Sequence, residues 1–433
     1  MLQGFVGQLF RQVDKTAFRI WIGFEALVVA LAQQVGTRIP NLSPLIIMRN
    51  CTEDDGCQDE QLSLVLDSNW RWVHVVGGYQ NCAHYDPADC AIEGVNYSKQ
   101  GIRTDPENLS VTLQMQGAGG AGGGSRLFVA DGQDYKTFNL INRELTFEVD
   151  VSSLECGTNG ALYFVSMDAT GGKGGNNMAG APYGLGYCDA QCPANRWYEG
   201  IQGFCCTEMD IWEANRQASA FTAHPCSSSG PCNGQECGHD GFCDRAGCDV
   251  NTYRLGDFQF YGPGMVVDSN KPVTVVTQFL TDDGTDSGNL SEIRQMYLQD
   301  GNVISNPKPT LPRINATNLT PKYCASEKAD FRSADLFQSK GGLSEITSAF
   351  RKGMVLTLSL WEDKSTEMRW LDSFVPIGSS APGDKRGRCN ASKITTEFIK
   401  AHDASAYTTY SHIRYGEIGS TTAARRLSVS LQV

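Results

Sequence analysis

Residues 205–215 have the sequence Cys-Cys-Thr-Glu-Met-Asp-Ile-Trp-Glu-Ala-Asn, which is the most informative stretch of the chain. It places Glu208, Asp210 and Glu213 within six residues, among apolar and aromatic neighbours. Burying charged groups costs free energy unless they are paired or used, and like charges at close range push one pKa up and leave another low. A protonated acid beside an ionised carboxylate is what cleavage of a glycosidic bond requires. The alternative is a solvated acidic strand edge, which the interleaved apolar residues disfavour.

The 16 cysteines of the chain indicate an oxidising compartment. Their number is even and they cluster, and a reducing compartment would not maintain such a set as disulfides. Zinc binding is the alternative, but the chain has no Cys-x-x-Cys pattern and only 6 histidines. We therefore expect a secreted protein, and eight Asn-x-Ser/Thr sites agree with secretion: Asn41, Asn50, Asn96, Asn108, Asn289, Asn315, Asn318 and Asn390.

The N-terminus has the pattern of a secretory signal peptide. Basic residues within 11–19 precede an apolar run that ends in Ala30-Leu31-Ala32, an A-x-A cleavage pattern. We expect residues 1–32 to be removed by a cut before Gln33. No other segment is long and apolar enough to span a membrane.

Length and charge limit the class of protein. A chain of 433 residues can bury a large core, and we expect one long domain over 33–420 with a short tail over 421–433. The net charge of −12, without any basic run, argues against nucleic acid and anionic membranes as partners.

Alternation of apolar and polar residues is the main secondary-structure pattern. Many short strands bounded by Gly, Asn, Asp and Pro turns predict an all-β sandwich or jelly roll. Residues 339–352 are the one stretch that predicts a short helix. The clearest predicted strands are 62–66, 145–151, 161–167, 273–279 and 354–361.

Short motifs along the chain accompany the opening stretch. They are NWRWVH at 69–74, GALYFVSMD at 160–168, YCDAQCP at 187–193, YRLG at 253–256, FYGPG at 260–264, and GMVL and SLW within 353–361. With EMDIWEAN at 208–215, they resemble the motifs of glycoside hydrolase family 7, the fungal-type cellulases, over roughly residues 33–420. The resemblance implies a concanavalin-like β-jelly-roll sandwich whose concave sheet carries a long glucan-binding groove under disulfide-stapled loops.

The resemblance also implies a retaining mechanism. Glu208 is similar to the family's nucleophile, Glu213 to its acid/base, and Asp210 to the partner that holds the nucleophile and tunes its pKa. On a regular strand, Glu213 would face the side opposite to the other two acids. Because a retaining pair needs its carboxyl groups about 5–5.5 Å apart, a β-bulge must re-aim Glu213. His224 has the family's position beside the acid/base, and a structural histidine is its alternative.

Glucan binding would depend on aromatic side chains. Trp70 and Trp72 are two residues apart, which predicts that they line one strand face, and they resemble stacking platforms of the outer negative subsites. Core packing is the alternative for such a pair. Trp361 and Trp370 resemble stacking residues close to the cleavage point. Further groove positions of the family match Arg126, Tyr163, Asp189, Gln191, Arg254 and Arg386.

The cysteines also match the family, and the double pairing of Cys205 and Cys206 would fix the start of the catalytic strand. The two catalytic carboxylates suffice for the reaction, so neither a metal nor an organic cofactor is implied. The implied partner is cellulose or another β-1,4-glucan chain. We expect a monomer, and we expect no carbohydrate-binding module in the tail. The implied disulfides are 51–57, 82–90, 156–389, 188–206, 192–205, 226–243, 232–237 and 248–324.

Shortened loops leave the cutting mode open. Eleven residues separate Pro193 from Cys205 and five separate Cys237 from Cys243, where chain-end-cutting members of the family carry longer loops that roof a tunnel. Residues 379–389 nevertheless resemble a tunnel loop. A partly open cleft is favoured; a chain-end cellobiohydrolase, an internally cutting endoglucanase and a gene prediction that lost exons all stay open. Outside the family, the alternatives are a non-catalytic glucan-binding lectin, which the intact acids disfavour, and a structural wall protein, which only the composition supports.

Overall fold

The computed structural model describes residues 34–82, 89–115, 124–174, 177–194, 201–363, 365–395, 397–398, 401 and 406–422. The chain divides into two compact units, Met1–Ala30 and Leu31–Val433, and all described residues belong to the second. The predicted signal peptide, residues 1–32, lies outside the described residues.

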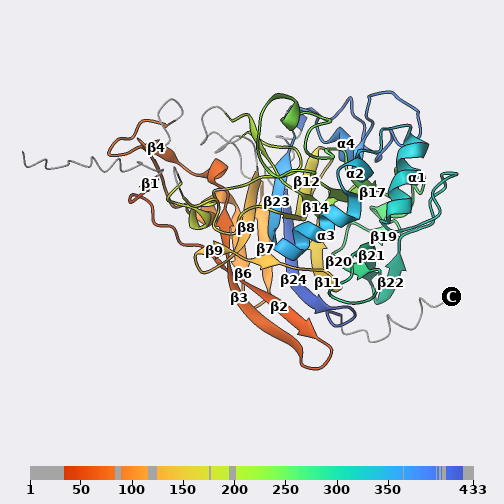
Figure 1. Ribbon diagram of the computed structural model, residues 1–433, viewed down its shortest axis with the longest axis horizontal. Coiled ribbons are helices and arrows are strands. Elements are labelled where there is room, and N and C mark those ends of the chain that lie inside the picture. Colours follow the sequence, from red (N-terminus) through yellow and green to blue (C-terminus); the bar gives the residue numbers. More distant parts are fainter. Residues whose placement is uncertain are drawn as a thin grey trace, which may run out of the picture. The chain divides into compact units, whose positions relative to one another are not determined.

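An antiparallel sheet that carries the acidic stretch forms one layer of the second unit (Figure 1). Its neighbours follow the order β17–β15–β14–β12–β23–β8–β3, with β9 and β10 attached at its margins. The strands span Cys248–Val250 (β17), Ser219–His224 (β15), Glu208–Ala214 (β14), Thr158–Val165 (β12), Met354–Glu362 (β23), Gly124–Asp131 (β8), Gly56–Leu66 (β3), Asp134–Tyr135 (β9) and Thr137–Phe138 (β10).

A second antiparallel sheet has the order β22–β21–β20–β11–β24–β7–β6. The hairpin of β2 (Leu45–Thr52) and β3 joins the two sheets, because β3 pairs with β8 whereas β2 pairs with β24. The protein is therefore a β-jelly-roll sandwich. The second-sheet strands span Asn302–Ser305 (β22), Leu290–Gln299 (β21), Val273–Thr281 (β20), Arg143–Asp150 (β11), Tyr407–Glu417 (β24), Ser110–Gln114 (β7) and Ile102–Asp105 (β6).

Smaller elements cover the ends of the sandwich. All five predicted strands are confirmed, and the predicted helix is confirmed as α3 (Gly342–Lys352). Among the described residues, no helix is long and apolar enough to cross a membrane. The remaining α-helices and strands are α1 (Pro321–Phe331), α2 (Leu336–Ser339), α4 (Arg369–Asp372), β1 (Gln34–Val35), β4 (Val73–Val75), β5 (Cys90–Ile92), β13 (Gly203–Cys205), β16 (Gly230–Cys232), β18 (Tyr261–Gly262) and β19 (Val267–Asp268).

Aromatic side chains from both sheets fill the core. Phe164 of β12 and Phe279 of β20 both contact Phe350 of α3 in edge-to-face geometry, at ring-centroid distances of 5.5 Å and 4.9 Å. All three rings are fully buried, and each contributes about 1.5–3 kcal/mol by burial. Helix α3 is thus fixed to both layers of the sandwich.

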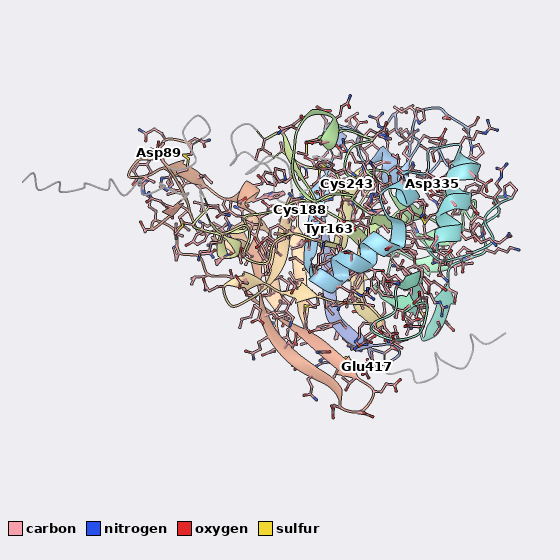
Figure 2. The ribbon with its side chains drawn as sticks, in the orientation of Figure 1. Asp89, Tyr163, Cys188, Cys243, Asp335 and Glu417 are labelled. Atoms are coloured by element: carbon pink, nitrogen blue, oxygen red, sulfur yellow. A yellow bond between two sulfur atoms is a disulfide. The ribbon has the colours of Figure 1, made fainter. Side chains whose placement is uncertain are left out.

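The eight implied disulfides are all present, and no cysteine is free. No cysteine is therefore left as a free thiolate that could bind zinc, and the zinc alternative is wrong. The bridges Cys188–Cys206 and Cys192–Cys205 hold the chain immediately before β14. Cys188, labelled in Figure 2, belongs to the same buried cluster as Tyr163 of β12, so the clamp is continuous with the sheet that carries the acids.

One sequence prediction needs correction here. Trp70 and Trp72 do not line a strand face, because Asp67 ends the strand: its Oδ1 accepts from the backbone N–H of Asn69 at 2.7 Å and starts a 3₁₀ turn over Ser68–Trp70.

The fold continues through residue 422, and Thr421 explains why. Its backbone N–H and its hydroxyl both donate to the buried Glu144 Oε1, at 3.0 Å and 2.6 Å. The side chain is 1% exposed.

Candidate active site

Strand β14 carries the three acids and lies between β12 and β15. Its register with both neighbours shifts after Asp210, and Ile211 is the extra residue of a β-bulge. Ile211 and the adjacent Trp212 are both fully buried in the core between the sheets. Because two neighbouring residues point inward, the parity of the strand changes, and Glu213 faces the same cavity as the other two acids. The predicted bulge is confirmed.

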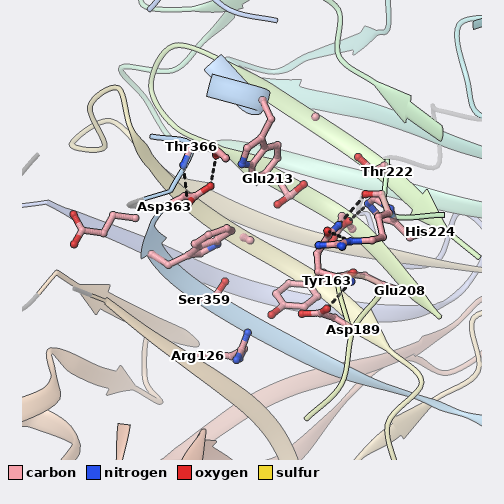
Figure 3. Close-up of a pocket in the computed structure, with 18 of the residues that line it drawn as sticks. Arg126, Tyr163, Asp189, Glu208, Glu213, Thr222, His224, Ser359, Asp363 and Thr366 are labelled. Carbon is pink, nitrogen blue, oxygen red and sulfur yellow. Dashed lines mark hydrogen bonds and ion pairs between the residues drawn. The ribbon is translucent and has the colours of Figure 1, made fainter. Parts of the chain in front are cut away.

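A cavity of about 860 Å³ lies over the first sheet (Figure 3). Its lining comes from strands β8, β12, β14, β15, β17 and β23 and from α4. The predicted site residues that line it are Trp70, Arg126, Tyr163, Asp189, Gln191, Glu208, Asp210, Glu213, His224, Trp361, Trp370 and Arg386.

Glu208 and Asp210 form a buried pair with distinct partners. The backbone N–H of Ala190 donates to Glu208 Oε2 at 3.0 Å, and His224 Nε2 lies 3.1 Å from Asp210 Oδ2. His224 Nδ1 lies 2.8 Å from the carbonyl oxygen of Asp244, which only accepts, so Nδ1 carries a proton. The contact with Asp210 then needs a second proton, on Nε2 or on Oδ2. His224 is therefore a direct partner of this acid.

Among the described residues, one side chain donates a hydrogen bond to Glu213. Asn159 Nδ2 donates to Glu213 Oε1 at 2.8 Å, and Asn159 is fully buried on β12. Because Oε1 accepts this hydrogen bond, a proton on the carboxyl group belongs on Oε2.

Burial raises the pKa of all three carboxyl groups. For Glu208, the charges of Asp210 and Asp189 add to burial, whereas His224 opposes it. Burial and then Asp189 raise the pKa of Asp210. Burial and the charge of Asp210 raise the pKa of Glu213 to about 8. The prediction that one acid keeps a low pKa is wrong, because burial penalises the anion of each of the three.

Tryptophan faces flank the acids. Trp361 lies near the end of β23 and Trp370 lies on α4, and their rings stack at a centroid distance of 6.2 Å and an angle of 30°. Trp70 lines another part of the same cavity. Flat apolar faces of this kind match the CH faces of a sugar ring.

A polar network lines the wall beside Glu208. Tyr163 and Tyr187 share a hydrogen bond of 2.9 Å, and the Tyr187 hydroxyl donates to Asp189 Oδ2 at 2.7 Å. The Arg126 guanidinium lies over the Tyr187 ring at 3.4 Å, and its Nε donates to Asp67 Oδ2 at 2.8 Å. Each partner is held in place, so the wall is preorganised.

Two predicted residues lie away from the cavity. Arg254 sits behind its wall, where Nη1 pairs with Asp249 and with Glu327, the latter at 2.9 Å. Asp249 itself lines the cavity, so Arg254 supports the wall from behind. Trp72 is not among the lining residues, and its ring stacks with Tyr79 at 6.1 Å.

Several lining or contacting residues escaped the sequence analysis. A two-residue period would have found some of them: Asn159 has the parity of Tyr163 on β12, and Ser359 has the parity of Trp361 on β23. Tyr187 lay inside a quoted motif. The other missed residues include Thr222, Arg245, Asp249 and Asn251.

Paired carboxyl groups in a cavity with aromatic faces fit an enzyme that cleaves glycosidic bonds. Residues 35–422 match the family model for glycosyl hydrolase family 7, and the chain belongs to this family. The protein is therefore a glycoside hydrolase.

Similar solved structures include enzymes of two kinds. A cellobiohydrolase from Daphnia pulex is 39% identical, with 90% of this chain and 100% of that chain covered and a TM-score of 0.84. A cellobiohydrolase from Melanocarpus albomyces in complex with cellotetraose is 33% identical, with 90% and 100% covered and a TM-score of 0.81. The endocellulase EGI from Humicola insolens is 31% identical, with 90% and 100% covered and a TM-score of 0.80.

Proposed function

We propose that this protein is a secreted cellulase that cleaves β-1,4-glucosidic bonds by a retaining, double-displacement mechanism. The β-bulge of β14 carries the proposal, because it turns Glu213 toward the cavity that already holds Glu208 and Asp210. The substrate class follows from the relatives, which are cellobiohydrolases and endocellulases. The eight disulfides support secretion, since reducing compartments do not maintain them.

In the first step, Glu213 acts as the acid. A pKa of about 8 keeps its carboxyl group protonated at neutral pH, and the proton on Oε2 is free to pass to the glycosidic oxygen. Glu208 attacks the anomeric carbon as that bond breaks, and the glycosyl group becomes an ester of Glu208. In the second step, Glu213 takes a proton from water, which attacks the same carbon and releases Glu208.

The nucleophile must be ionised for this attack, and His224 and the backbone N–H of Ala190 both lower the pKa of Glu208 against the effect of burial. The N–H of Ala190 stabilises the anion of Glu208. The carboxyl group of Asp210, in contrast, can stay protonated, with the proton on Oδ2 facing His224 Nε2. We therefore assign the shared proton of the carboxyl pair to Asp210 and the negative charge to Glu208. Asp210 and His224 act as positioning and charge-tuning groups.

The stereochemistry of the first product tests the mechanism. NMR of a cello-oligosaccharide digest is expected to show the β-anomer of the new reducing end first, with the α-anomer growing later by mutarotation. Double displacement inverts the anomeric carbon twice, so the configuration is retained. Appearance of the α-anomer first would refute the retaining mechanism.

The cutting mode is proposed as internal or mixed, through a partly open cleft that releases cellobiose or cello-oligosaccharides. The loop from Cys237 to Cys243 is short, and its disulfide partners hold it close to β13 and β16. A strictly chain-end cellobiohydrolase is the alternative, which the 379–389 loop favours.

Amorphous cellulose distinguishes these two modes. An open cleft is expected to leave a large share of the new reducing ends on the insoluble polymer early in the digest. Predominantly soluble cellobiose from the start would instead establish chain-end cutting.

A further inference from the structure

Asp372 is a fully buried carboxyl group behind the wall of the cavity. It is the last residue of α4, is 0% exposed and is not among the residues that line the cavity. Its Oδ2 accepts hydrogen bonds from the backbone N–H of Gly157 and from Asn215 Nδ2, both at 2.8 Å. One buried oxygen atom therefore joins three segments that are distant in sequence, and a buried hydrogen bond of this kind is costly to lose.

Each of these three segments carries a group of the active site two residues away. Gly157 lies two positions before Asn159, which donates to Glu213 Oε1. Asn215 lies two positions after Glu213 itself, and the buried carboxyl group lies two positions after Trp370. The acid, its hydrogen-bond donor and one aromatic face of the cavity are thus all linked to the same oxygen atom.

The side chain of Asn215 is fixed in the sheet. Its Nδ2 also donates to the carbonyl oxygen of Thr158 at 3.0 Å. Its Oδ1 accepts from the backbone N–H groups of Gln217 and Ala218 at 2.8 Å and 3.2 Å. Because these bonds close the turn from β14 to β15, Asn215 belongs to the rigid sheet, and the carboxyl group of Asp372 ties α4 to it.

Other contacts hold α4 without the carboxyl group. Leu371 shares a buried cluster with Ala220 of β15, and the backbone N–H of Cys389 donates to the carbonyl oxygen of Asp372 at 2.9 Å. We therefore expect a variant without the carboxyl group to keep its fold. A helix of four residues has few hydrogen bonds of its own, so the angle at which Trp370 faces the cavity depends on the carboxyl group.

We propose that Asp372 is a positioning residue that sets the place of the Trp370 face relative to the proton donor Glu213. Under the proposed function, on which this inference rests, Glu213 passes its proton to a glycosidic oxygen of a glucan held on the aromatic faces of the cavity. That oxygen must come within hydrogen-bond reach of the donor, and a misplacement of about 1 Å can cost about 10²-fold in rate. Asp372 therefore acts on catalysis without touching the substrate.

Kinetics with two leaving groups test this role. Asp372→Ala removes the accepting oxygen and is expected to lower kcat on a cello-oligosaccharide about 10- to 100-fold, with a much smaller change in KM. An aryl cellobioside with a strongly acidic phenol needs no proton on its leaving group, so its kcat/KM is expected to stay within about 3-fold of the parental value. A general loss of folded protein would lower both rates equally.

Two further variants separate position from stability. Asp372→Asn keeps the accepting oxygen and places its amide nitrogen where Oδ1 has no hydrogen-bond partner among the described residues, so it is expected to act like the parent. Asp330→Ala is the matched control. Asp330 is also buried on a helix, α1, and accepts from the backbone N–H of Arg313 at 3.0 Å, but it does not line the cavity. Both rates are expected to stay parental in this control.

A double-mutant cycle identifies the group through which Asp372 acts. In a Trp370→Ala background, Asp372→Ala is expected to cost nothing further, because the face that it positions is gone. Parental oligosaccharide kinetics in Asp372→Ala, equal losses on both substrates, or equal losses in both backgrounds would refute this inference while leaving the glycosidase intact. A parent protein that cleaves neither substrate would refute the proposed function, and this inference with it.

Discussion

Replacing Glu208 by Gln is expected to lower kcat on β-glucan by about 10⁴-fold or more, because the amide cannot form the glycosyl-enzyme ester. The side chain keeps its shape and its hydrogen bond from Ala190, so binding of cello-oligosaccharides is expected to survive. Initial rates on soluble oligosaccharides and the dissociation constant of the same ligand, measured together, separate catalysis from binding.

Glu107→Gln is the matched control, because this acid is exposed on the β6–β7 hairpin and its loss leaves the cavity untouched. The control is expected to retain full activity. Unchanged glucan hydrolysis in Glu208→Gln would refute the assigned mechanism. A parent protein that binds oligosaccharides without cleaving them would instead identify a lectin.

Replacing Glu213 by Gln is expected to lower kcat on cellulose by about 10²–10⁴-fold, since the leaving oxygen then receives no proton. An aryl cellobioside with a strongly acidic phenol needs no such proton. It is expected to give a burst of phenol equal to the enzyme concentration, followed by slow turnover, because the base of the second step is missing. Azide, which attacks without base assistance, is expected to restore that turnover.

The pH dependence gives Glu213 a second signature. The acid works only when protonated, so activity of the parent enzyme is expected to fall as pH rises through about 8. A glutamine does not titrate, and residual activity of Glu213→Gln should lack this alkaline limb. If the fall in activity at alkaline pH persists in the variant, a group other than Glu213 causes it.

The effect of Glu213→Gln on the unfolding temperature should depend on pH in a defined direction. Burial raises the pKa of Glu213 from its ordinary 4.5 to about 8, so its contribution to stability is complete below pH 4.5 and is lost as pH rises toward 8. Glu213→Gln is therefore expected to unfold at a higher temperature than the parent at pH 8 and at a similar temperature at pH 5. A lower unfolding temperature at both pH values would mean that the variant is simply damaged.

Much of the fold could be predicted because its signals are local. Period-two alternation located the strands, and the spacing of Glu208 and Glu213 required the bulge. The disulfide pairs came from the family resemblance, since spacing alone leaves many pairings open.

The failures have one local and two long-range causes. Trp72 was placed on a strand because its parity matched that of Trp70. The strand instead ends before both residues, where the Asp67 side chain caps a 3₁₀ turn. Arg254 was placed in the groove, yet its partner Glu327 lies 73 positions away and draws it behind the wall. The pKa prediction failed because a sequence does not tell which cations reach buried acids.

The bulge at Ile211 ties the direction of the proton donor to the interior of the sandwich. Ile211 and Trp212 act as two anchors set in the core, and Glu213 projects from the backbone next to them. Repacking the interior to raise heat tolerance would shift these anchors and tilt the donor, although no substrate ever touches them. Engineers who want a hardier enzyme with the same rate should therefore work at the rim of the sandwich and leave these two side chains alone.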